Sequence, residues 1–141
     1  MREIKFIVIH CTATHQDAKI DSMVNHWRKV LGWKNNGYHY IIDKNGNHTK
    51  ITELNQLANG VRNYNKSSIH VSYIGGIDSK GNPIDNRTIQ QKDKLLYLCR
   101  ELKRQFPNAI IKGHRDFPNV KKNCPSFDAQ KEYEDIFDIF G

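Results

Sequence analysis

Short hydrophobic runs alternate with segments in which hydrophobic residues recur at helical spacing. Residues 5–10, 68–74 and 109–113 are rich in β-branched residues and predict strands. Residues 21–31, 88–106 and 128–140 carry hydrophobic residues three and four positions apart and predict helices. This alternation indicates an α/β fold, and we expect a single domain with a central mixed β-sheet flanked by helices.

Turn-forming residues mark the ends of these elements. Asp21 is a predicted N-cap of the first helix, and Gly32 is its stop. The dipeptide Asn45-Gly46 separates residues 38–43 from residues 48–51 and predicts a β-hairpin. Residues 88–91 form a predicted capping box, and Pro107 closes the helix that follows it. Trp27 and Cys99 lie on hydrophobic helix faces, so we expect both in the core.

Composition narrows the class of protein. A chain of 141 residues suits one domain, which we expect to span residues 1–141. The three cysteines are an odd number, which argues against a secreted disulfide scaffold. The first apolar run, residues 6–9, is too short for a signal peptide, and no segment has the length of a membrane span. We therefore expect a protein made in the cytoplasm without a signal peptide.

The formal net charge is +7, which favours anionic partners. Nucleic acid, a membrane surface and the bacterial cell wall all fit this description, and the charge alone does not choose among them. Most of the basic residues are interrupted by leucines or acids, as on the solvent-facing side of a helix.

Two histidines at predicted strand ends and one cysteine are candidate metal ligands. His10 ends the first strand, and His114 directly follows the strand at residues 109–113. Cys124 lies ten positions after His114, so a loop must fold back to bring the two together; Pro118 and Pro125 suit such a loop. Two imidazoles and a thiolate leave one position of a tetrahedral ion open, as in catalytic zinc sites.

Four sequence blocks then carry a resemblance to a known family. They are IHCTAT at residues 9–14, GW at 32–33 with GYHY at 37–40, YIGGID at 73–78, and residues 113–128, which include GH and KNCPSFD. In this order and spacing they resemble the zinc N-acetylmuramoyl-L-alanine amidases, a family that includes short phage lysozymes and shares its fold with the peptidoglycan recognition proteins. The resemblance covers nearly the whole chain.

The resemblance implies a site and an activity. It implies that His10, His114 and Cys124 bind Zn²⁺, and that Tyr38 and Lys122 are catalytic. The reaction it implies is hydrolysis of the amide between the lactyl group of N-acetylmuramic acid and L-alanine of the stem peptide. The partner is then peptidoglycan, and we expect no nucleic-acid partner, no membrane insertion and a monomer.

The place of action follows from the same resemblance. We expect the protein to act on the cell wall after release or export, as a phage or prophage endolysin. A cytoplasmic recycling amidase and an exported effector stay open as alternatives.

Two positions depart from the family pattern. Gly60 stands where relatives often carry a histidine, and His70 stands where many carry a glycine after a serine-isoleucine pair. These changes suggest the hypothesis that Arg62, Tyr64 or His70 takes over part of the substrate contact.

Two other functions compete with catalysis. A module that only binds peptidoglycan typically lacks the cysteine ligand, which is present here as Cys124. A basic nucleic-acid-binding domain with a structural zinc needs a fourth ligand, and the sequence offers none at a suitable spacing.

Overall fold

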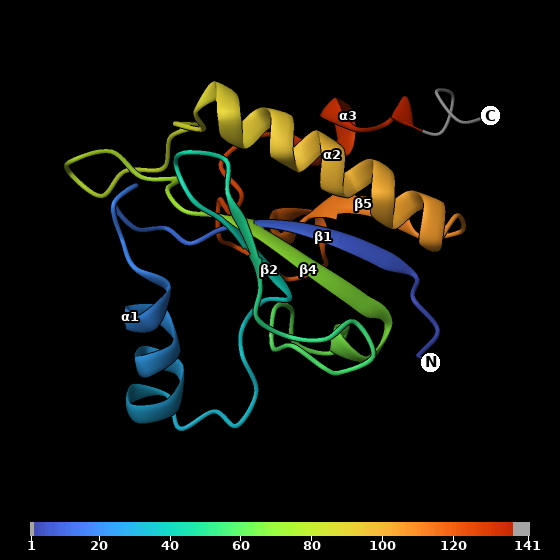
Figure 1. Ribbon diagram of the computed structural model, residues 1–141, viewed down its shortest axis with the longest axis horizontal. Coiled ribbons are helices and arrows are strands. Elements are labelled where there is room, and N and C mark those ends of the chain that lie inside the picture. The colour runs from blue at the N-terminus through green and yellow to red at the C-terminus, as the bar shows by residue number, and fades with distance from the viewer. Residues whose placement is uncertain (1, 137–141) are drawn as a thin grey trace.

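One mixed sheet in the strand order β3-β2-β4-β1-β5 forms the centre of the molecule in the computed structural model, which describes residues 2–136 (Figure 1). Its strands are β1 (Phe6–Cys11), β2 (Tyr40–Ile42), β3 (His48–Lys50), β4 (Ser68–Tyr73) and β5 (Ile110–Gly113). Strand β1 pairs in parallel with both β4 and β5, and β4 pairs in parallel with β2. The hairpin partner β3 runs antiparallel to β2, so the expected mixed sheet is confirmed.

The helices lie around this sheet. They are α1 (Ile20–Asn25), α2 (Ile89–Gln105) and α3 (Ala129–Glu132), with a π-helical turn η1 (His26–Val30) and 3₁₀ turns η2 (Asn65–Ser67) and η3 (His114–Asp116). Helix α2 runs along the sheet with α3 beside it, whereas α1 lies apart from both (Figure 1). The predicted capping box of α2 is confirmed, because Thr88 Oγ1 accepts from the backbone N–H of Gln91 and the Gln91 side chain accepts from that of Thr88.

The first and last helices differ from their predictions. Lys19, and not Asp21, is the N-cap of α1, and the helix widens into a π-helical turn from His26. Trp27 is buried as expected, at 7% exposure. Helix α3 ends at Glu132, so it is shorter than predicted, and residues 137–140 of the predicted helix lie outside the described residues.

Strand alternation divides the interior into two faces. Ile7, Ile9 and Cys11 of β1 point into the main core, which α2 covers with residues such as Leu95 and Cys99. Val8 points to the other side, against Val61 and Phe117. Because His10 is two residues after Val8, it lies on the face opposite α2.

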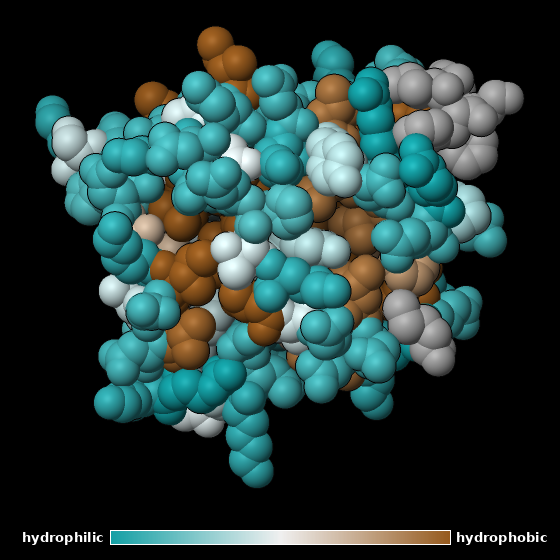
Figure 2. Space-filling view, in the orientation of Figure 1, coloured by the Kyte–Doolittle hydropathy of each residue, from teal (hydrophilic) through white to brown (hydrophobic). Residues whose placement is uncertain are grey.

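The outer surface is mainly hydrophilic on the face seen in Figure 2, where hydrophobic atoms show mostly between polar side chains. Among residues 2–136, every helix is too short or too polar to cross a bilayer.

Candidate metal centre

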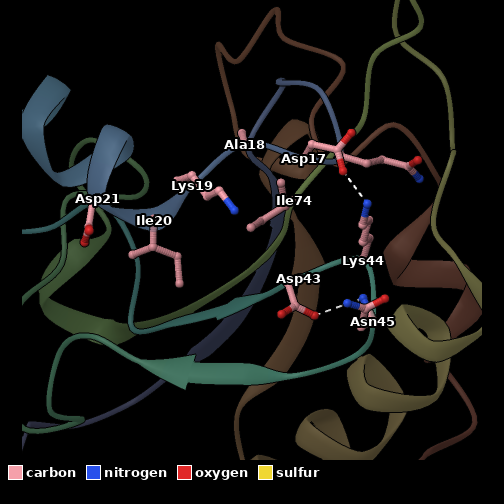
Figure 3. A pocket seen from close by; sticks show the side chains of 10 residues that line it. Asp17, Ala18, Lys19, Ile20, Asp21, Asp43, Lys44, Asn45 and Ile74 are labelled. Carbon is pink, nitrogen blue, oxygen red and sulfur yellow. Dashed lines mark hydrogen bonds and ion pairs between the residues drawn. The ribbon is translucent and has the colours of Figure 1, made fainter.

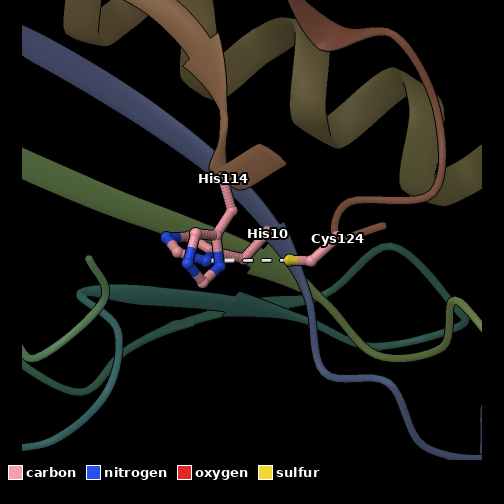
Figure 4. A group of neighbouring side chains, drawn as sticks. All are labelled: His10, His114 and Cys124. Atoms are coloured by element: carbon pink, nitrogen blue, oxygen red, sulfur yellow. Dashed lines mark hydrogen bonds between the residues drawn. The ribbon is translucent and has the colours of Figure 1, made fainter. Parts of the chain in front are cut away.

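The two candidate histidine ligands lie at the carboxyl ends of neighbouring parallel strands. The register pairs Ile9 of β1 with Gly113 of β5, so the residues that follow this pair are His10 and His114. Their ring centroids are 4.8 Å apart, and the Cys124 sulfur points towards the two rings (Figure 4). The carboxyl ends of parallel strands are where α/β folds place their sites, and the histidine pair follows that rule.

The loop that carries Cys124 is held against the sheet by backbone and side-chain hydrogen bonds. The backbone N–H of Arg115 donates to the Cys124 carbonyl at 2.8 Å, which confirms that the loop folds back to His114. The Tyr73 hydroxyl donates to the Pro125 carbonyl at 2.6 Å, and Ser126 Oγ donates to the Gly76 carbonyl at 2.9 Å. The loop therefore has a fixed position relative to β4 and β5.

Close packing between Gly113 and Pro125, and one further hydrogen bond, determine the position of the Cys124 sulfur. A Cβ on Gly113 would lie 2.8 Å from Pro125 Cδ, so only glycine allows the loop to come this close. The backbone N–H of Cys11 donates to Cys124 Sγ at 3.2 Å. An N–H donor of this kind stabilises a thiolate.

The ligand atoms lie close enough together to face one shared metal position. One nitrogen of each histidine and Cys124 Sγ all lie within 4.8 Å of one another. His10 Nδ1 is 3.8 Å from Cys124 Sγ, whereas tetrahedral coordination with ordinary Zn–N and Zn–S bonds gives about 3.5 Å. For this pair only a small contraction would be needed, and two imidazoles with one thiol are a donor set that fits Zn²⁺. Since the group within residues 2–136 comprises three ligands, a tetrahedral ion would keep one open position.

Burial keeps both histidines in the neutral form that binds metals. The pKa of His10 is well below its usual value because the ring is buried, and the nearby His70, His114 and Lys122 lower it further. Burial and then the Lys122 charge lower the pKa of His114 to about 4. The Cys11 thiol and burial instead raise the pKa of the Cys124 thiol, so metal binding has to release a proton from this sulfur.

Tyr38 lies directly beside His10, as the sequence predicted for a site residue. Its ring centroid is 5.1 Å from that of His10 and 5.6 Å from that of Trp27. The hydroxyl donates to the Cys11 carbonyl at 3.4 Å. Burial raises the pKa of Tyr38, with smaller contributions from Cys124 and Cys11. The phenol is therefore protonated at neutral pH and available as a hydrogen-bond donor.

Lys122 lies on the exposed part of the same loop, two residues before Cys124. Its ammonium charge is among the causes that lower the pKa values of His10, His114 and Cys124, so it lies close enough to act on all three. Its catalytic role stays a prediction.

The sequence interpretation missed the contact between His70 and His10. The hypothesis that His70 contacts substrate is wrong, because the side chain is fully buried at 0% exposure and its Nδ1 lies 2.9 Å from His10 Nε2. Tyr64 packs its ring against Phe6 and Phe117, while Arg62 is exposed. Strand alternation carried the missing signal: Ile69 and Val71 face the main core, so His70 must face the same side as His10.

A separate hollow lies away from these residues. It has a volume of about 470 Å³ and is lined by residues 16–21, residues 43–45 and Ile74 (Figure 3). Lys44 and Asp17 form an ion pair across it. None of the predicted site residues lines this hollow.

Comparisons with known proteins identify the family of the chain. The family model described as N-acetylmuramoyl-L-alanine amidase matches residues 1–127. The endolysin of Enterobacteria phage K11 is 36% identical over 131 residues, which cover 92% of this chain and 85% of that protein. The endolysin of Escherichia phage T7 is 32% identical over 129 residues, covering 91% and 84%.

Solved structures share the fold. The Ph2119 endolysin from a Thermus scotoductus bacteriophage superposes with a TM-score of 0.80 at 25% identity, covering 97% of this chain and 86% of that one. Bumblebee PGRP-SA superposes with a TM-score of 0.77 at 17% identity, covering 95% and 82%, and this likeness concerns the fold alone.

Proposed function

Because the chain belongs to the N-acetylmuramoyl-L-alanine amidase family, we propose that it hydrolyses peptidoglycan at the amide between the lactyl group of N-acetylmuramic acid and L-alanine. The observation that carries this proposal is the convergence of His10, His114 and Cys124 at the ends of β1 and β5. Three ligands of this type, with a fourth position open, suit hydrolysis better than a structural role.

We propose Zn²⁺ as the metal that these three side chains hold. When bound, zinc would lower the pKa of a water molecule towards neutrality and polarise the scissile carbonyl. The protein contributes two neutral imidazoles and a sulfur that accepts the Cys11 N–H. The His10 side chain is buried at 1% exposure, so this ligand itself is shielded from bulk water.

Tyr38 and Lys122 would stabilise the negative charge that develops on the carbonyl oxygen. The protonated phenol of Tyr38 is a donor whose ring is fixed between His10 and Trp27. Lys122 brings a positive charge to the exposed side of the same centre. Loss of one such donor costs about 3–4 kcal/mol of transition-state stabilisation in comparable sites.

The substrate and the place of action are inferred from the net charge of the chain and from its relatives. The formal net charge of +7 favours approach to an anionic cell wall. Because its relatives are phage endolysins, we propose that this chain also acts on the wall as an endolysin and does so as a monomer.

Product analysis tests the bond that is cleaved. Zinc-loaded protein is incubated with purified peptidoglycan, and new amino termini and new reducing sugars are both measured. We expect amino termini on L-alanine without reducing sugars. Reducing ends in place of amino termini would indicate a glycosidase and reject the proposal.

A further inference from the structure

The His70 side chain connects the candidate ligand His10 to the loop before β4. The ring of His70 lies 4.9 Å from that of His10, and both residues are buried, at 0% and 1% exposure. Its Nδ1 is 2.9 Å from His10 Nε2, and its Nε2 is 2.9 Å from Asn65 Oδ1. One imidazole thus joins the candidate metal centre to Asn65 through two hydrogen bonds of ordinary length.

The backbone N–H of Val61, which contacts the Asn65 side chain, fixes the direction of both hydrogen bonds. Asn65 Oδ1 also accepts from the backbone N–H of Val61 at 2.8 Å. A backbone N–H only donates, so this Asn65 atom is the oxygen and acts as an acceptor. The atom of His70 that faces it, Nε2, must therefore carry a hydrogen.

The same reasoning continues to His10. A neutral histidine with a hydrogen on Nε2 has a lone pair on Nδ1, so His70 Nδ1 accepts a hydrogen bond. Its partner, His10 Nε2, must then be the donor. The second nitrogen of His10, Nδ1, is left with its lone pair, and this is the atom 3.8 Å from Cys124 Sγ.

We propose that His70 is a positioning residue, which fixes His10 in the Nε2–H tautomer and thereby presents the Nδ1 lone pair to the metal. This inference rests on the metal centre proposed above. It assigns His70 no contact with substrate. Partners of this kind set the tautomer and the ring orientation of histidine ligands, and their loss costs about 10- to 100-fold in metal affinity.

Gly60 supports this role because it makes room for the His70 ring. A Cβ built on Gly60 would lie 2.2 Å from His70 Nδ1 and 2.4 Å from its Cε1 and Cγ. No side chain larger than a hydrogen fits at position 60 while His70 bonds to His10. The two departures from the family pattern, Gly60 and His70, are therefore parts of one arrangement.

The tautomer can be measured directly by ¹⁵N NMR of histidine side chains in the full chain, after metal removal at neutral pH. We expect both His10 and His70 to carry their hydrogen on Nε2. In His70→Phe, which keeps a ring but removes the acceptor, His10 should populate the Nδ1–H form. In His70→Asn, whose amide oxygen can replace Nδ1 as the acceptor, the Nε2–H form should return.

Two NMR results would overturn the inference. One is an Nδ1–H tautomer of His10 in the wild type, which needs no variant to observe. The other is an unchanged Nε2–H tautomer in a folded His70→Phe variant.

Zinc affinity, measured by competition with a chelator, gives the second readout. We expect His70→Phe to bind zinc about 10- to 100-fold more weakly than the wild type, and His70→Asn to recover most of the loss. Val71→Ala is the matched control: this neighbour is fully buried but faces the main core, so it should lower the melting temperature and leave zinc affinity unchanged.

The two proposals fail in different ways. A wild type that binds no zinc rejects the metal centre, while the NMR measurement still decides the tautomer. A wild type and a His70→Phe variant with equal zinc affinity reject the positioning role and leave the metal centre intact.

Discussion

Adding one methyl group at Gly60 should disrupt the hydrogen bond between His70 and His10. In Gly60→Ala the new Cβ would lie 2.2 Å from His70 Nδ1, whereas ordinary contacts of a Cβ begin near 3.4 Å. The His70 ring would have to move by roughly 1 Å, which breaks a hydrogen bond of 2.9 Å. The backbone of Gly60 is outside the left-handed region, so the cost comes from packing and not from conformation.

The magnitude follows from three contributions. Overpacking a well-packed interior costs about 1–3 kcal/mol. Leaving the His10 N–H without a partner costs about 1–3 kcal/mol more. The lower conformational entropy of alanine in the unfolded chain offsets about 0.4–1 kcal/mol. We expect a net loss near 3 kcal/mol, or a fall in melting temperature of roughly 10 °C for a chain of this length.

The assay is a double-mutant cycle by denaturant unfolding of the metal-free protein. His70→Gly alone should also destabilise, because it empties the space that the ring fills. In the double variant the alanine methyl occupies part of that space, so the two costs should be non-additive by at least about 1 kcal/mol. A loss below about 0.5 kcal/mol in Gly60→Ala, or strict additivity in the cycle, would refute the reasoning.

Three further predictions concern the catalytic groups and the metal. Tyr38→Phe keeps the ring against His10 but removes the hydrogen-bond donor, so kcat should fall about 10²- to 10³-fold with zinc content unchanged. Steady-state kinetics with metal analysis checks this, and an unchanged kcat would exclude Tyr38 from the chemistry. The melting temperature of metal-free protein should fall as pH drops from about 6.5 to about 4. Over this range His114 is protonated in the unfolded chain but not in the folded one, where its pKa is lowered to about 4. A melting temperature independent of pH over this window would contradict the prediction. Chelation should abolish turnover and lower the melting temperature, and stoichiometric Zn²⁺ should restore both, whereas turnover that survives complete metal removal would rule out the zinc mechanism.

Periodicity and turn residues were enough to predict most of the fold. The β-branched runs predicted β1, β4 and β5 to within one or two residues, because a strand in the middle of a sheet is hydrophobic on both faces. Thr88 with Gln91 predicted the start of α2, since a capping box is a local hydrogen-bond pattern. The first helix was predicted less well, because its π-helical turn and the Lys19 cap have no local sequence signature.

The candidate site was predictable where each ligand lies at the end of a recognisable element. His10 and His114 end adjacent parallel strands, so their meeting follows from the topology. The role of His70 was not predictable in the same way. Strand alternation puts its side chain on the same face as His10, but its contact with His10 depends on the register of β4 against β1 and on the space beside Gly60, and both are set by tertiary packing.

Zinc content and peptidoglycan digestion, measured on the same samples of wild type and Cys124→Ser, test the central claim most directly. Cys99→Ala, which removes a buried thiol from the main core, serves as the control. We predict one zinc per chain and release of L-alanine amino termini for the wild type and the control, and loss of both for Cys124→Ser. Full cleavage by a zinc-free Cys124→Ser variant would contradict the account.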